Sequence, residues 1–209
     1  LVKLANKECL LSSTYEPSSK TKMKLRAAPG AGTMYLQSEC AEALAELFAG
    51  AEEAGYKLYL KSAYRAYKTQ KTMYNNRLER NNGKDDGWVS KPGASDHQTG
   101  LGCDVVPGSW KDKSMNSNMA STPECQWMAE HCYEYGFVIR YPEDKQDITE
   151  INYEPWHLRY VGKEVARYIW RNGLCLEEFH EQLQAAIDAY LAAGGDARRV
   201  EDLIQTSAE

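Results

Sequence analysis

Two short segments of the sequence carry the residue types of a catalytic metal site. Residues 95–104 contain an imidazole at His97 and a carboxylate at Asp104, and residues 154–157 contain Glu154 and a second imidazole at His157. Two imidazoles and one carboxylate are a ligand set for a zinc ion that keeps one coordination position for water. The remaining carboxylate could then serve as the general base. These residues predict metal-assisted hydrolysis.

The spacing of these residues predicts how the three ligands meet. Two glycines lie between His97 and Asp104 and argue against a helix, so we expect a turn that leads into a strand. Alternation along that strand would place Asp104 on one face and its two neighbours on the other. His157 would come from a different strand, and the site would therefore be assembled across a sheet.

Each of these residues also has an ordinary structural explanation. A single histidine is more often structural or solvated than a ligand, and we interpret His131 and His180, on predicted helices, in that way. Glu154 alone could be a surface turn residue. Its position three residues before His157 strengthens the metal-site interpretation, because the intervening Pro-Trp pair would hold the carboxylate at a fixed reach.

A third segment, residues 62–70, supplies groups that could bind a substrate carboxylate. Arg65 could form two hydrogen bonds to a carboxylate or stabilise a tetrahedral oxyanion. Gln70 and Ser95 would add neutral hydrogen bonds if their loops converge, and we expect Trp156 to line the same site. An arginine taken alone is more often a surface ion-pairing residue, so this assignment depends on the segments meeting in space.

Hydrophobic periodicity predicts a mixture of helices and strands. Helices are expected at 39–54, 66–80, 122–135, 162–172, 176–191 and 196–204, and strands at 57–62, 101–106, 137–141 and 157–161. The polar, glycine-rich residues 81–93 should form a long loop. The order of the elements lacks a regular alternation of strand and helix. It therefore favours an α+β fold with a central, largely antiparallel sheet flanked by helices.

Composition and charge narrow the class of function. The chain has 209 residues, with 25 Lys and Arg against 30 Asp and Glu, and a formal net charge of −5. It has no dense basic patch, which argues against nucleic acid as a partner. No apolar run approaches the roughly 18 residues that span a bilayer. The chain begins at Leu1, and a signal peptide or membrane anchor upstream of it would be compatible with this start.

The cysteines allow two interpretations. None forms a CxxC pair, so a cysteine zinc site is not expected. Cys125 and Cys132 lie seven residues apart on a predicted helix, about 10.5 Å along its axis, which is too far for a disulfide. The thiols can be small buried hydrophobes, or an even number in an exported protein can form disulfides. The six residues are Cys9, Cys40, Cys103, Cys125, Cys132 and Cys175.

Together, the three segments resemble zinc D-alanyl-D-alanine carboxypeptidases of the VanY type, in the wider group of lysostaphin-type and hedgehog-like folds. That family's pattern is Ser-x-His followed seven residues later by Asp, then Glu-x-x-His, preceded by Ser-x-Tyr-Arg with a Gln five residues on. The resemblance extends through 135–142, 157–162 and 176–179, and covers about residues 40–180. The matching residues are Ser62, Tyr64, Arg65, Gln70, Ser95, His97, Asp104, Glu154 and His157.

The resemblance implies a role for each matching residue. Glu154 would be the general base, and Arg65, with Gln70 and Ser95, would hold the terminal carboxylate or the scissile carbonyl of the substrate. Two departures are small: Asp96 replaces a commoner Glu, and the pair before the aspartate differs from the commoner small residues. Neither departure removes a catalytic group. The residues that would bind one zinc ion are His97, Asp104 and His157.

The implied activity is removal of the C-terminal D-Ala from peptidoglycan stem peptides that end in D-Ala-D-Ala. An L,D-carboxypeptidase acting on tetrapeptide stems is the nearest alternative. A peptidoglycan endopeptidase is another, although a carboxylate clamp at Arg65 weighs against it. A non-catalytic, zinc-stabilised binding domain is the least favoured, because Glu154 is intact and a coordination position would remain open.

These assignments lead to expectations for the whole chain. We expect an N-terminal arm at 1–37 that packs on a peptidase domain at 38–180, followed by a helical extension at 181–209. A cell-wall substrate implies work outside the cytoplasmic membrane of a bacterium, by an anchored or secreted protein. A cytoplasmic form that acts on precursors is the alternative. We expect a monomer.

Overall fold

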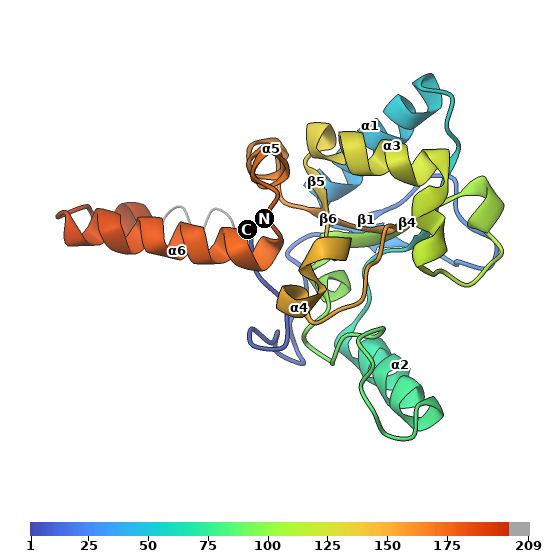
Figure 1. Cartoon of the computed structure of the whole chain (residues 1–209), viewed down its shortest axis with the longest axis horizontal. Helices are drawn as coiled ribbons and strands as arrows, with labels where there is room; N and C mark the ends of the chain where they lie inside the picture. The colour runs from blue at the N-terminus through green and yellow to red at the C-terminus, as the bar shows by residue number, and fades with distance from the viewer. Residues whose placement is uncertain (201–209) are drawn as a thin grey trace.

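A four-stranded sheet forms the centre of the fold in the computed structural model, which describes residues 1–200 (Figure 1). Its strands lie in the order β3-β4-β6-β5, and every neighbouring pair is antiparallel. The predicted α+β fold with a central, largely antiparallel sheet is confirmed. The bounds of the strands are Leu58–Ser62 for β3, Gly102–Pro107 for β4, Phe137–Ile139 for β5 and His157–Tyr160 for β6.

Helices flank this sheet, as the sequence predicts. The α-helices are α1 (Ser38–Glu53), α2 (Tyr67–Arg80), α3 (Pro123–His131), α4 (Gln146–Thr149), α5 (Lys163–Asn172) and α6 (Leu176–Ala192). Short 3₁₀ helices are η1 (Asp96–Thr99), η2 (Gly108–Trp110), η3 (Ser117–Ser121), η4 (Cys132–Tyr135) and η5 (Glu143–Lys145). Among the described residues, no helix has both the length and the apolar character to cross a bilayer.

The main hydrophobic core lies between α1, α3 and one face of the sheet. In β4, Cys103 and Val105 point into this core, whereas Asp104 between them faces the other side. β6 alternates in the same way, with Leu158 in the core. The apolar stripe of α1 follows helical spacing, because its buried residues include Cys40, Leu44, Leu47 and Ala51.

Helix α2 has a different character from the core helices. Gln70 is its one buried residue, and Figure 1 shows α2 extending away from the sheet. Residues 81–93 follow it without helix or strand, as predicted. An irregular loop of this length is unusual in a compact domain and is often functional. Together, α2 and this loop form an arm that begins beside β3.

The N-terminal residues wrap over the domain. They contain the short antiparallel pair of β1 (Thr21–Lys22) and β2 (Tyr35–Leu36), and Ala27 forms an isolated parallel bridge with Leu60 of β3. Gln98 of η1 donates hydrogen bonds from its side chain to carbonyls of this arm, at 2.8 Å from Ser12 and 3.3 Å from Tyr15. The buried Gln98 side chain is thereby paired with the arm, although these arm residues lie outside regular secondary structure.

Several element ends differ from the prediction. The α-helix predicted at 122–135 ends at His131 and continues as the 3₁₀ turn η4, which stops at Gly136 with φ 85°. The strand predicted at 137–141 ends at Ile139, although the Arg140 N–H still donates to the His157 carbonyl at 3.0 Å, and the chain then turns at Pro142. The predicted boundary between the peptidase domain and the helical extension, after residue 180, falls inside α6. Residues 197–200 are helical, and the remainder of the helix predicted at 196–204 lies outside the described residues.

The six cysteines are free thiols. Five are buried and Cys9 is exposed, so the interpretation as small buried hydrophobes holds for all but Cys9. Burial raises the pKa of Cys132 to about 12 and that of Cys125 to about 11. Both thiols therefore stay protonated at neutral pH.

Candidate active site and metal centre

His97, Asp104 and His157 meet on the sheet face opposite the main core. Asp104 of β4 lies directly across from His157 of β6 in the antiparallel register, so their side chains share one face. His97 lies on η1, and a left-handed turn at Gly100, with φ 72°, leads from η1 toward β4. All three side chains are buried. The structure therefore brings the predicted ligands together across two strands, as the sequence indicates.

The geometry of these three residues suits a metal ion. Asp104 Oδ2 lies 3.3 Å from His97 Nε2, and Asp104 Oδ1 lies 3.5 Å from His157 Nδ1. The candidate ligand atoms all lie within 4.8 Å of one another, and within residues 1–200 this is the one such group. Asp104 Oδ1 is buried without a hydrogen-bond partner in the described chain. A buried carboxylate between two imidazoles, with one oxygen that receives no hydrogen bond, is what a bound cation would satisfy.

The protonation of His97 is set by a backbone carbonyl. His97 Nδ1 lies 2.7 Å from the carbonyl oxygen of Ala63. A carbonyl only accepts hydrogen bonds, so Nδ1 carries the proton and Nε2 presents its lone pair toward Asp104. Burial and the nearby Arg65 guanidinium lower the pKa of His97, which favours the neutral imidazole that binds metals.

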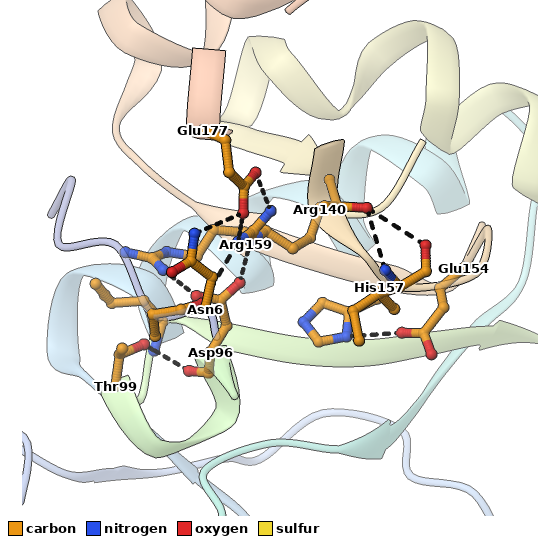
Figure 2. A network of polar contacts seen from close by, with 12 residues as sticks. Asn6, Asp96, Thr99, Arg140, Glu154, His157, Arg159 and Glu177 are labelled. Carbon is orange, nitrogen blue, oxygen red and sulfur yellow. Dashed lines mark hydrogen bonds and ion pairs between the residues drawn. The ribbon is translucent and has the colours of Figure 1, made fainter. Parts of the chain in front are cut away.

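His157 and Glu154 form a buried pair in one tight turn (Figure 2). His157 Nδ1 lies 3.1 Å from Glu154 Oε2, and the His157 N–H donates to the Glu154 carbonyl at 3.1 Å. Burial raises the pKa of Glu154, although His157 partly opposes this shift. Burial acts to lower the pKa of His157, but Glu154 and Asp104 outweigh it and raise that pKa. Nδ1 therefore faces two carboxylates, in a position where a metal would compete with its proton.

The charge of Asp104 is maintained despite its burial. Burial by itself would raise its pKa, but His97, His157 and Arg65 outweigh that effect and lower it to about 2. The Asp104 carboxylate is thus ionised at any pH at which the enzyme would work. An ionised oxygen ligand is the form that a hard or borderline cation needs.

Arg65 is held at the wall of the site by neutral partners. Its Nη1 donates to Gln70 Oε1 at 2.8 Å, and its Nη2 donates to Ser62 Oγ at 3.1 Å. Gln70 in turn donates from Nε2 to the Ser90 carbonyl at 2.7 Å. Arg65 Nη2 lies 3.9 Å from Asp104 Oδ2. The guanidinium is therefore oriented next to His97, Asp104 and His157, the candidate metal ligands that we call the metal group, rather than extended into solvent.

One open cavity of about 380 Å³ contains every site residue that the sequence predicts. Trp156, which is almost fully buried, lies at its wall with its ring 6.4 Å from that of Trp88. Sequence reasoning assigned no role to several further lining residues, since they come from loops and helix faces without a motif. The predicted residues in the cavity are Arg65, Gln70, Ser95, His97, Asp104, Glu154, Trp156 and His157. The missed residues include Met73, Arg77, Trp88, Met115, Asn116 and Tyr141.

A buried network of charges lies beside the metal group (Figure 2). Asp96, directly before the first imidazole, accepts hydrogen bonds from Arg140, at 2.6 Å from its Nε, and from Arg159. Arg140 also donates to both oxygens of Glu177 in α6, at 2.7 and 2.8 Å. Arg159 donates to two backbone carbonyls of the N-terminal arm, each at 2.8 Å. Two arginines thus balance two carboxylates at almost complete burial. The sequence alone identified Asp96 only as a small departure.

Comparison with known proteins agrees with this geometry. The family model for VanY, D-alanyl-D-alanine carboxypeptidase, matches residues 33–163. A putative carboxypeptidase, YodJ of Bacillus subtilis strain 168, is 38% identical over 88% of this chain and 68% of its own length. A D-alanyl-D-alanine carboxypeptidase of Enterococcus faecalis is 34% identical over 65% of this chain, which spans only 52% of that relative.

Solved structures show the same similarity. The LD-carboxypeptidase LdcB shares 40% identity, with a TM-score of 0.79 over 85% of this chain and 84% of that chain. A variant of the vancomycin-resistance D,D-pentapeptidase VanY, from a VanB-type cassette and in complex with Zn(II), shares 28% identity. Its TM-score is 0.70, over 85% of this chain and 97% of that chain. The chain therefore belongs to the VanY family of D-alanyl-D-alanine carboxypeptidases, and the protein is a peptidase.

Proposed function

We propose that this protein is a zinc-dependent carboxypeptidase that removes the C-terminal D-Ala from peptidoglycan stem peptides ending in D-Ala-D-Ala. One observation carries the proposal: a buried His-His-Asp group, a buried glutamate and an anchored arginine line one open cavity. The zinc complex of a VanY relative supports the choice of metal. The site would hold the ion through His97, Asp104 and His157.

When bound, zinc supplies Lewis acidity and lowers the pKa of a water molecule toward neutrality. The contribution of the chain is to prepare the ligand atoms. The Ala63 carbonyl fixes the tautomer of His97, and the register of β4 and β6 places Asp104 opposite His157. Both features are contacts within the chain itself, and they hold the ligand atoms in position.

Glu154 is the proposed general base. Its carboxylate lies in the cavity beside His157, and burial raises its pKa toward the range in which proton transfer at neutral pH is efficient. It would accept a proton from the attacking water and later donate it to the departing D-Ala amine. The turn through Pro155 and Trp156 holds Glu154 close to the metal group without making it a ligand.

Arg65 is the proposed anchor for negative charge. It would bind the terminal carboxylate of the peptide or share the charge of the tetrahedral oxyanion. Gln70 keeps the guanidinium oriented, and Ser95 offers a hydroxyl on the same cavity wall. A carboxylate anchor next to the metal group favours cleavage of the last peptide bond over cleavage within the stem.

One specific observation favours a second candidate, an L,D-carboxypeptidase that acts on tetrapeptide stems. The structural likeness to the LD-carboxypeptidase LdcB has a TM-score of 0.79, against 0.70 for the VanY D,D-pentapeptidase. Both activities release a C-terminal D-Ala and need the same metal, base and carboxylate anchor. They differ in the stereochemistry of the residue before the scissile bond.

The test is release of D-Ala by the zinc-loaded protein from two matched stem peptides. One peptide ends in D-Ala-D-Ala, and the other is the tetrapeptide that ends in a single D-Ala. We expect release from the pentapeptide. Release from the tetrapeptide alone would replace the D,D activity with the L,D activity, and release from neither by zinc-loaded protein would contradict both.

The proposed substrate also indicates where in the cell the protein works. Stem peptides are part of the bacterial cell wall, so we propose that the protein works outside the cytoplasmic membrane, as a monomer. An upstream anchor is compatible with this proposal. Detection of the protein in the cell-envelope fraction, with a mass of about one chain by light scattering, would support both points.

A further inference from the structure

Helix α2 extends the substrate cavity away from the metal group. Gln70, Met73 and Arg77 line the cavity, and their spacing of three and four residues places them on one face of the helix. Gln70 contacts Arg65 beside the metal group. Arg77 lies seven residues further along α2, which corresponds to about 10.5 Å along the axis. Figure 1 shows this helix running outward from the sheet. The cavity therefore contains a second guanidinium, carried about two helical turns beyond Gln70.

Arg77 is oriented by a carboxylate of the loop that follows α2. Its Nε lies 3.1 Å from both carboxylate oxygens of Asp86, and its Nη2 lies 2.5 Å from Oδ2. The third nitrogen, Nη1, makes no hydrogen bond within residues 1–200, and the side chain is 39% exposed. One edge of the guanidinium is thus fixed by Asp86, and the other remains available at the cavity wall.

A guanidinium held in this way is suited to bind another anion. Its rotamer is already fixed, so little side-chain entropy is lost when a ligand arrives. The planar fork of donors also matches a carboxylate better than a lysine ammonium does. Asp86 neutralises part of the positive charge of Arg77, so the pair would bind free anions only weakly. A carboxylate that belongs to a substrate already bound at the metal group would still be recognised.

We propose that Arg77 is a specificity-determining residue that recognises a second carboxylate of the substrate, about three residues before its C-terminal residue. This inference rests on the proposed function. Three residues of extended peptide cover about 10 Å, close to the separation of Gln70 and Arg77 along α2, and a γ-linked residue adds two bonds to this reach. In a stem pentapeptide this position is a γ-linked D-glutamate, whose α-carboxylate is either free or amidated. Arg77 selects the free acid.

The simpler role for the pair is to fasten residues 81–93 to α2. Trp88, Val89 and Ser90 of this loop line the cavity, so a loosened loop would impair binding of every peptide. The two roles predict different patterns. A fastening role affects free and amidated peptides equally, whereas a recognition role affects only the peptide that carries the free carboxylate.

The experiment compares two pentapeptides that differ only at the D-glutamate α-carboxyl, free acid against amide. KM and kcat for D-Ala release are measured with the wild type, Arg77→Gln, Arg77→Lys and the control Arg80→Gln. Arg80 is exposed in the last turn of the same helix, so its substitution removes an equal charge outside the cavity. Calorimetry measures the affinity of both peptides for the zinc-loaded proteins.

We expect Arg77→Gln to raise KM for the free acid about tenfold with little change in kcat, the size of one charge-assisted hydrogen bond. KM for the amide should stay within about twofold, Arg77→Lys should lie in between, and Arg80→Gln should match the wild type. Equal changes for both peptides, or a wild type that does not distinguish them, would overturn the proposal. If neither peptide is hydrolysed, the proposed activity fails. In that case the test of Arg77 is the ratio of the two peptides' affinities measured by calorimetry. Equal or undetectable binding of the free acid and the amide would overturn its role.

Discussion

At the scale of single residues, Glu154 and His157 share one turn but have separate proposed tasks. Glu154 is buried beside the metal group, and its side chain contacts His157 Nδ1 at 3.1 Å. Asp104 Oδ1 and His157 Nε2 are buried without hydrogen-bond partners in the described chain. The two roles can be separated by measuring metal content. Loss of the base Glu154 should leave the zinc bound, whereas loss of the ligand His157 should release it.

Replacing Glu154 by Ala should leave the zinc content near one ion per chain and reduce kcat by roughly 10²–10⁴-fold, the contribution of a general base. Zinc content is measured by elemental analysis and turnover by D-Ala release. The control is Glu143→Ala, which removes an exposed carboxylate at the start of η5. Retained turnover in Glu154→Ala would exclude its role as the base.

Replacing His157 by Ala should lower the zinc content, because two remaining ligands hold the ion much more weakly. The comparison is His131→Ala, whose side chain lies on α3, 39% exposed, where it contacts Glu134 and the Trp127 ring. Elemental analysis after dialysis against metal-free buffer gives the readout. Unchanged zinc content in His157→Ala would remove this residue from the ligand set.

At the scale of elements, the buried charges of Asp96, Arg140, Arg159 and Glu177 join parts of the chain that are distant in sequence. They connect η1, the end of β5, β6, α6 and the N-terminal arm (Figure 2). Residues 1–32 and α6 lie outside the segment that matches the family model. The turn that carries His97 is therefore supported by elements beyond that segment.

Breaking this network should be costly, since removing one partner leaves a buried charge uncompensated. We expect Glu177→Gln to lower the free energy of unfolding by about 3 kcal/mol. Glu181→Gln, one turn later on the same helix and exposed, should change it by less than about 0.5 kcal/mol. Urea unfolding followed by fluorescence measures both. Equal effects would show that Arg140 does not depend on the Glu177 charge.

The same network predicts a dependence of stability on pH. Burial acts to raise the pKa of Asp96, but Arg159 and Arg140 outweigh it and hold the pKa below its ordinary value. A lowered pKa in the folded state stabilises the protein above the unfolded pKa, near about 4, and this contribution is lost as the pH falls through the folded value. The difference in unfolding free energy between the wild type and Asp96→Asn should therefore shrink between pH 7 and pH 3. A constant difference in urea titrations would contradict this assignment.

At the scale of the whole molecule, the metal group links two central strands to the turn at η1. A ligand that binds only the folded state stabilises it by mass action. We expect a strong zinc chelator to lower the melting temperature by several degrees, and added zinc to restore it. His157→Ala should show little response to the chelator. An unchanged melting temperature in the wild type would indicate that the site does not bind zinc in solution.

The sequence alone determined the chemistry and the class of fold. Residue types and short spacings predict His97, Asp104, Glu154 and His157 as candidate site residues, because a metal site needs particular side chains that recur in local motifs. Alternation in β4 correctly placed Asp104 away from the core, since side chains on a strand alternate by geometry. Element types were also predicted well, because hydrophobic periodicity is a local property.

Only the tertiary structure decided what surrounds these motifs. The pairing of Arg140 with Glu177 and the place of Arg77 in the cavity join residues through the fold or through loops without a motif. The type of a charged residue does not show whether its side chain is buried in a network or solvated on the surface. Its burial and partners depend on how strands and helices pack, and that packing is a property of the whole chain.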